Sequence, residues 1–262
     1  LTSMIQIQSG SPLRRPFFWA HGTDFANFAR ILDREQPFYV MPPPGLDGRH
    51  PIYSKAEDIV AYHIDQMKIV QPGGPYIVAG YCLGGHLALN IAAELLRRGE
   101  DVSLVVLVDV TAPDYDRIAQ QTRRDYLERF VYHLRYGQLP SRVVGKVKDI
   151  VNKRKVSLLG SEELRLLQQL DDIQQKAFEF RIPEGYPGRV VAFTCATYDA
   201  RKPQDSDARW TRLAPKGVEH YVIPGDHSTL MREPNIDQLV AVLNRVLREE
   251  GEMATHPETP VG

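Results

Sequence analysis

The segment that most constrains the fold is an almost unbroken apolar run at 102–109 (VSLVVLVD). A strand that is apolar at nearly every position is usually buried on both faces, as in parallel sheets covered by helices. Other short apolar runs alternate along the chain with segments of helical spacing. The expected strands are 16–20, 37–41, 75–80, 102–109, 189–198 and 219–223, and the expected helices are 25–34, 54–70, 83–98 and 236–249. This alternation predicts an α/β fold with a doubly wound, mostly parallel sheet.

One interval interrupts the alternation of strands and helices. Residues 114–187 contain helical patterns and no convincing strand, so they predict a helical lid over the carboxyl ends of the sheet. The predicted organisation is an α/β core at 1–113 and 188–250, a helical lid insertion at 114–187, and a polar tail at 251–262. Because the chain begins with Leu and ends in polar residues, we expect a domain cut from a longer chain.

The composition argues against several classes of function. A formal net charge of −1 over 262 residues is not that of a dedicated nucleic-acid binder. No apolar run reaches about 18 residues, so no membrane segment is expected. Two cysteines are too few for a disulfide scaffold and, without a signal-peptide core, they indicate a reducing, cytoplasmic location. The histidines lack paired spacing with Cys or Glu, and no dinucleotide-binding loop occurs. We therefore expect neither a metal nor a cofactor bound by the domain.

The clearest chemical signature is the segment 80–85 (GYCLGG), which lies between an expected strand and an expected helix. This is the setting and spacing of a nucleophile elbow, with Cys82 at the position of the nucleophile. Gly80 and Gly84 permit the sharp turn, since larger side chains would collide with the neighbouring helix and strand. The helix N-terminus favours a thiolate, and the Leu83 amide is a candidate oxyanion donor. The alternative interpretation is a small buried cysteine.

His227 is the candidate base, because it follows the last expected strand in a loop (GDHS) from which an imidazole can reach the elbow. A third group must orient the imidazole and stabilise its cation. Asp109 and Asp199 each end an expected strand, and either carboxylate could serve. We prefer Asp109 and keep Asp199 as the alternative acid, while either residue could instead belong to a turn or a helix cap.

The loop after the first expected strand, 21–24 (HGTD), is expected to complete the oxyanion hole. The Thr23 amide is the preferred oxyanion donor, and the Gly22 amide is the alternative. His21 is expected to brace this loop through a hydrogen bond rather than to act as the base. Cys195 lies within an apolar strand and is expected to pack in the core.

Five segments together resemble the thioesterase domains that end nonribosomal peptide and polyketide synthases. They are PFFWAHG at 16–22, PFYVMPPPGLDG at 37–48, GGPYIVAGYCLGG at 73–85, VSLVVLVD at 102–109 and IPGDHSTLMREP at 223–234. The resemblance runs from about Pro16 to Leu247. It implies an α/β-hydrolase fold with a lid inserted after the acid, which supports Asp109 in that role. The family usually has serine at the elbow, so Cys82 is a departure.

The resemblance implies a substrate held as a thioester on the 4'-phosphopantetheine arm of an upstream acyl or peptidyl carrier protein. The acyl chain passes to the nucleophile and is released by water or by an internal hydroxyl or amine. Acyl transfer between two thiols is nearly thermoneutral, so an acyl-Cys82 enzyme would keep its transfer potential. We therefore expect cyclising release slightly ahead of hydrolysis. The alternatives are a stand-alone (type II) editing thioesterase that clears misprimed carriers, a small-ester hydrolase, and a non-catalytic scaffold of the same fold.

A basic cluster in the expected lid is a candidate docking face for an acidic carrier protein. It could equally be a solvated helix face. The cluster consists of Arg142, Lys146, Lys148, Lys153, Arg154 and Lys155.

Overall fold

The computed structural model describes residues 3–21, 25–45, 53, 55–111 and 183–255. These residues belong to one compact unit, formed by 1–113 and 173–262. The predicted lid at 114–187 lies outside the described residues except for 183–187, and so does the basic cluster at 142–155. In the described ranges, no helix is both long enough and apolar enough to cross a bilayer.

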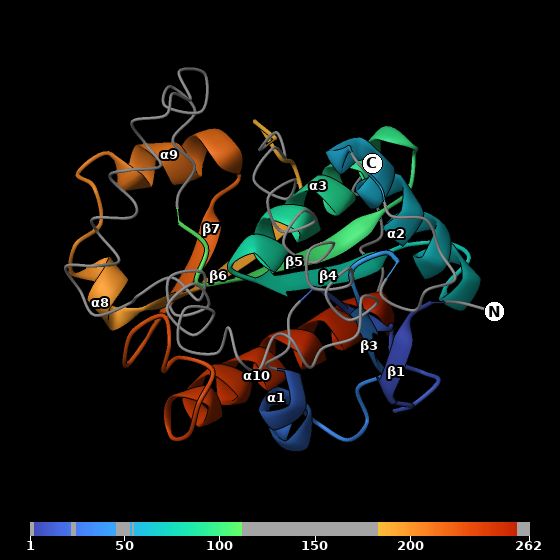
Figure 1. Cartoon of the computed structure of the whole chain (residues 1–262), viewed down its shortest axis with the longest axis horizontal. Coiled ribbons are helices and arrows are strands. Elements are labelled where there is room, and N and C mark those ends of the chain that lie inside the picture. Colours follow the sequence, from blue (N-terminus) through green and yellow to red (C-terminus); the bar gives the residue numbers. More distant parts are fainter. Residues whose placement is uncertain (1–2, 22–24, 46–52, 54, 112–182, 256–262) are drawn as a thin grey trace, which may run out of the picture. The chain divides into compact units, whose positions relative to one another are not determined.

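The described strands form one seven-stranded sheet in the order β1-β3-β2-β4-β5-β6-β7 (Figure 1). Strand β1 is antiparallel to β3, and the other neighbouring pairs are parallel. The strands are β1 (Ile5–Gln8), β2 (Phe17–Ala20), β3 (Phe38–Met41), β4 (Tyr76–Tyr81), β5 (Val102–Val108), β6 (Arg189–Cys195) and β7 (Val218–Ile223). The apolar run that suggested a parallel sheet is β5, which lies inside the sheet between β4 and β6. The carboxyl ends of the parallel strands therefore meet at one edge.

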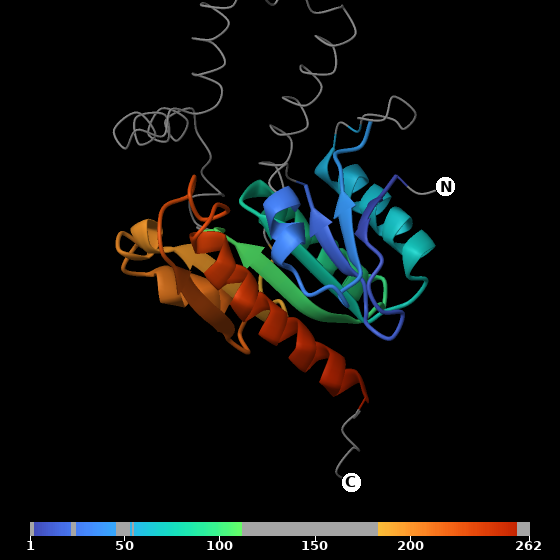
Figure 2. The same cartoon turned by 90° about the horizontal axis from the view of Figure 1, so that it is seen from below.

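Helices cover both faces of the sheet, as Figures 1 and 2 show. One face packs against α2 (Ala56–Val70), α3 (Leu83–Arg97) and α9 (Ser206–Leu213). The other face packs against α1 (Phe25–Ile31) and α10 (Asn235–Thr255). This arrangement confirms the prediction of an α/β-hydrolase core with a mostly parallel, doubly wound sheet.

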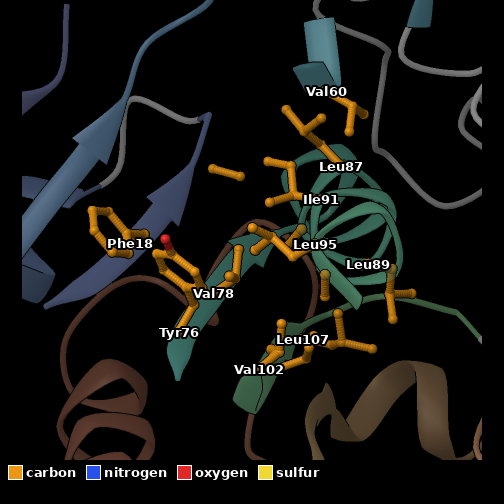
Figure 3. Packing of buried hydrophobic residues seen from close by; sticks show 14 of the residues in the cluster. Phe18, Val60, Tyr76, Val78, Leu87, Leu89, Ile91, Leu95, Val102 and Leu107 are labelled. Atoms are coloured by element: carbon orange, nitrogen blue, oxygen red, sulfur yellow. The ribbon is translucent and has the colours of Figure 1, made fainter. Parts of the chain in front are cut away.

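The packing of α3 on the sheet fixes where this helix begins. Leu87, Ile91 and Leu95 recur at the spacing of one helix face and are fully buried. Figure 3 shows these side chains with Val78 of β4 and Leu107 of β5, in the same apolar cluster. Burying a side chain of this size contributes about 1.5–3 kcal/mol. The N-terminus of α3 is thus anchored directly after β4, at the predicted elbow.

Several details of the predicted organisation were wrong or incomplete. Strand β1 and helix α9 were missed. The strand predicted at 189–198 ends at Cys195, because Thr197 donates hydrogen bonds from its backbone N–H and its hydroxyl to the carbonyl of Gly225 and the chain turns into α8 (Ala196–Asp199). Helix α10 continues to Thr255, into the predicted tail. Tyr186, assigned to the lid, is 2% exposed and packs in the core, where its N–H donates to Leu213 at 2.6 Å.

Candidate active site

The carboxyl edge of the sheet brings Cys82, Asp109 and His227 together. Cys82 directly follows β4, and its N–H donates to the carbonyl of Val108 at 2.8 Å. Asp109 directly follows β5, and its N–H donates to Phe193 at 2.7 Å. These two bonds continue the parallel ladder one residue beyond the strands. His227 lies in the connection between β7 and α10, which begins at the same edge.

The backbone at Cys82 has the geometry of a sharp elbow. Its φ of 53° and ψ of −116° are unusual for a residue with a side chain, and it is the N-cap of α3. A Cβ added at Gly80 would lie 2.1 Å from the carbonyl of Gly84, and one added at Gly84 would lie 2.1 Å from the carbonyl of Ala20. These contacts confirm the steric role expected for the two glycines. Leu83, the candidate oxyanion donor, is the first residue of α3.

The side chains of His227 and Asp109 are joined by a hydrogen bond. The Nδ1 atom of His227 lies 2.5 Å from Oδ2 of Asp109, and Oδ1 accepts the backbone N–H of Cys195 at 3.0 Å. The Asp109 side chain is only 6% exposed. Burial raises the pKa of Asp109, but the bonds from His227 and Cys195 outweigh burial and hold it below its ordinary value. Asp109 is therefore ionised and accepts a hydrogen bond from the Nδ1–H group of His227, which leaves Nε2 for proton transfer.

His227 also interacts with Cys82. Burial lowers the pKa of His227, but the hydrogen bonds and charges of Asp109 and Cys82 outweigh it and raise the pKa to about 10. Cys82 and Asp109 thus both favour the protonated imidazole at 227. Cys82 is partly exposed. The arrangement can hold a nucleophilic sulfur beside a proton donor.

The loop that carries His227 is fixed from two sides. The ring of Tyr81 stacks on the imidazole with centroids 4.9 Å apart and an interplanar angle of 18°, and its hydroxyl donates to the His227 carbonyl. Asp226 accepts the backbone N–H groups of Ser228 and Thr229 at 2.9 and 3.0 Å. The role of Tyr81 was not predicted from the sequence. The one sequence feature that could have identified Tyr81 is its position as an aromatic residue directly before the candidate nucleophile.

His21 has a buried partner that the sequence did not identify. Its Nε2 lies 3.0 Å from Nε2 of His63, which belongs to α2 and is 1% exposed. Burial lowers the pKa of His21 to about 4, and burial together with the charge of His21 lowers the pKa of His63 well below its ordinary value. Both rings are therefore neutral near pH 7, so one donates an N–H to the other. This contact agrees with a bracing role for His21.

The remaining candidates are Asp199, Cys195, Gly22 and Thr23. Asp199 lies in α8, not at a strand end, and contacts Lys202 at 3.4 Å. Cys195 is 2% exposed, and burial and the charge of Asp109 raise its pKa to about 12. Gly22 and Thr23 are outside the described residues. Across the part of the chain that the structure describes, no group of three or more His, Cys, Asp or Glu side chains could hold a metal.

Sequence comparison matches residues 16–247 to the family described as "Thioesterase domain". Chondramide synthase cmdD from Chondromyces crocatus is 25% identical over 267 residues, which cover 89% of this chain and 7% of that protein. Atromentin synthetase from Tapinella panuoides is 34% identical over 110 residues, which cover 40% of this chain and 12% of that protein. The chain thus spans only a small part of the length of these relatives.

Two solved structures share the fold. The four-domain nonribosomal peptide synthetase AB3403, bound to AMP and glycine, superposes with a TM-score of 0.71 at 19% identity, over 94% of this chain and 20% of that one. The NocB thioesterase domain, in covalent complex with a fluorophosphonate nocardicin G analogue, superposes with a TM-score of 0.62 at 19% identity. That superposition covers 93% of this chain and 99% of the NocB domain.

Proposed function

Because the chain belongs to the thioesterase domain family, we propose that it releases an acyl or peptidyl chain from a carrier protein through an acyl-Cys82 enzyme. The curated relatives are named as synthases and synthetases and are much longer than this chain. Their names support a substrate delivered as a 4'-phosphopantetheine thioester by an upstream carrier. The domain itself would then need no cofactor.

The observation that carries the proposal is the geometry at the carboxyl edge of the sheet. Cys82 stands on a strained elbow at the N-terminus of α3, and its interaction with His227 raises the pKa of the imidazole. His227 is in turn held by the buried carboxylate of Asp109. A nucleophile, a proton carrier and an orienting acid in this order are the parts of a catalytic triad.

The proposed acylation step uses each part in turn. The Cys82 thiolate attacks the thioester carbonyl, and the developing oxyanion is stabilised by the Leu83 amide and by an amide of Gly22 or Thr23. The tetrahedral intermediate collapses, the bond to the pantetheine sulfur breaks, and His227 gives its proton to that departing sulfur. In the release step an acceptor O–H or N–H loses its proton to His227 and attacks the acyl carbon. The Cys82 thiolate then leaves.

Cysteine in place of the usual serine bears on the release step. Exchange of an acyl group between two thiols is close to thermoneutral, so the acyl-enzyme keeps the activation of the original thioester. Attack by an internal amine or hydroxyl therefore remains favourable, even where it closes a strained ring. On this ground we place cyclising release slightly ahead of hydrolysis.

The test is intact-mass analysis of the protein after mixing with hexanoyl-pantetheine. The wild type is expected to gain one hexanoyl group at Cys82. Cys82→Ala should gain none, because the nucleophile is gone, and Cys82→Ser should be acylated but deacylate more slowly. The chain offers a matched control in its other cysteine, since it has two. Cys195→Ala should be labelled like the wild type.

Two outcomes would contradict the proposal. An unmodified wild-type protein would favour the non-catalytic scaffold, and labelling at a residue other than Cys82 would reject the nucleophile. The same experiment with native carrier-bound substrate separates the modes of release. Free acid as the single product would reject cyclisation, and broad hydrolysis of short acyl carriers would favour an editing hydrolase.

A further inference from the structure

Tyr81 contacts both the side chain and the main chain of His227. Its ring lies nearly parallel to the imidazole, at 4.9 Å and 18°. Its hydroxyl donates to the backbone carbonyl of the same histidine. Tyr81 is the last residue of β4 and is paired with Val108 of β5, so its backbone belongs to the centre of the sheet. A loop residue is thereby held to a central strand by two separate contacts.

The stacked ring lies where it can favour a positive charge on the imidazole. An aromatic face attracts a cation that lies over it, and the attraction grows when water is excluded. The other groups that act on His227 are the carboxylate of Asp109 and the sulfur of Cys82. Asp226, next in the chain, is engaged by the N–H groups of Ser228 and Thr229. A neutral ring stacked on the imidazole favours the protonated form without competing for its nitrogen atoms.

We propose that Tyr81 is a positioning residue, which holds His227 over Cys82 and favours its imidazolium form. The inference rests on the proposed function, since it assigns Tyr81 to the base of that triad. The adjacent residues 81 and 82 then have linked tasks. Residue 82 supplies the nucleophile and residue 81 positions the proton carrier, so the distance between the sulfur and the imidazole is set at the end of a single strand.

The test compares Tyr81→Phe and Tyr81→Leu in single-turnover acylation by hexanoyl-pantetheine between pH 5 and 9. Tyr81→Phe keeps the ring and loses one hydrogen bond, so acylation should slow about 3-fold. Tyr81→Leu loses both contacts, so acylation should slow roughly 5- to 30-fold. The imidazole nitrogen shifts of His227, followed by NMR, should report a lower pKa in Tyr81→Leu and a nearly unchanged pKa in Tyr81→Phe.

Tyr221 provides a matched control, because its ring stacks on Phe193 at 5.5 Å and 25°. Tyr221→Phe and Tyr221→Leu should leave the pH profile of acylation unchanged. The inference is overturned if Tyr81→Leu acylates at the wild-type rate with an unchanged His227 pKa. If Tyr81→Leu does not fold, Tyr81→Phe decides, and an unchanged acylation rate overturns the inference. A wild type that is not acylated rejects the proposed function instead, so the two failures are distinct.

Discussion

Replacing Asp109 by Asn tests the triad with almost no change of shape. The amide oxygen must stay at the Oδ1 position, because the Cys195 N–H needs an acceptor there. The amide NH2 then faces Nδ1 of His227, which can no longer carry a proton. A neutral imidazole is thereby forced to carry its proton on Nε2, and the carboxylate that stabilised the cation is lost.

The size of the effect follows from the pKa of His227. The rise from 6.5 to about 10 corresponds to about 5 kcal/mol net of the opposing effect of burial, and Asp109 and Cys82 together supply it. Because the His227 side chain is 40% exposed, solvent screening reduces this figure. We assign about 2–3 kcal/mol to Asp109, which corresponds to a roughly 30- to 150-fold loss in the rate of acylation.

The assay is single-turnover acylation by hexanoyl-pantetheine at pH 7, read by intact mass. Asp199→Asn is the matched control and should acylate at the wild-type rate, since Asp199 contacts Lys202. Thermal unfolding of each variant shows whether the buried site tolerates the substitution. An Asp109→Asn variant that folds and acylates within 3-fold of the wild type would refute the reasoning. If Asp199→Asn lost activity and Asp109→Asn did not, the role of the orienting acid would be assigned to Asp199 instead.

Two further predictions concern stability. Gly80→Ala should destabilise the protein by about 3 kcal/mol, because the new Cβ would lie 2.1 Å from the Gly84 backbone, whereas Gly73→Ala meets nothing within 4 Å and should be neutral in urea unfolding. Equal urea midpoints for Gly80→Ala and Gly73→Ala would contradict this prediction. The neutral His21–His63 pair makes the unfolded state bind more protons between about pH 4 and 6.5, so the free energy of unfolding should decrease as the pH is lowered through this range. His63→Gln should reduce that fall by about 1–2 kcal/mol between pH 7 and 5, and identical pH dependence in both proteins would reject the effect.

The fold could be predicted where burial leaves a strong pattern in the sequence. Strand β5 is apolar because both of its faces are covered, and α3 shows its buried face as a regular spacing. Strand β1 has neither signal. Its four residues, IQIQ, are exposed or half-buried, and it is an edge strand held by β3 alone. The end of β6 was misplaced for a similar reason, since the turn depends on the carbonyl of Gly225, far along the chain.

In the candidate site, too, some residues could be predicted from the sequence and others could not. Cys82, Asp109 and His227 each follow a strand, so the order of strands and the parallel topology were enough to place them at one edge. The partners of these residues were less visible. Tyr81 reaches a carbonyl 146 residues away, and His21 meets His63 across 42 residues. Such contacts depend on how helices and loops pack, and no local pattern records them.

In the proposed mechanism, the use of cysteine changes what His227 must do at each step. Before acylation Cys82 and Asp109 both raise the pKa of His227, so the imidazolium would be ready to protonate the departing pantetheine sulfur. An acyl group on Cys82 would remove two of the interactions that raise this pKa. Having given up its proton, the imidazole would then be more easily kept neutral and could accept the proton of the releasing nucleophile. Acylation of the sulfur would thereby change His227 from an acid for loading into a base for release.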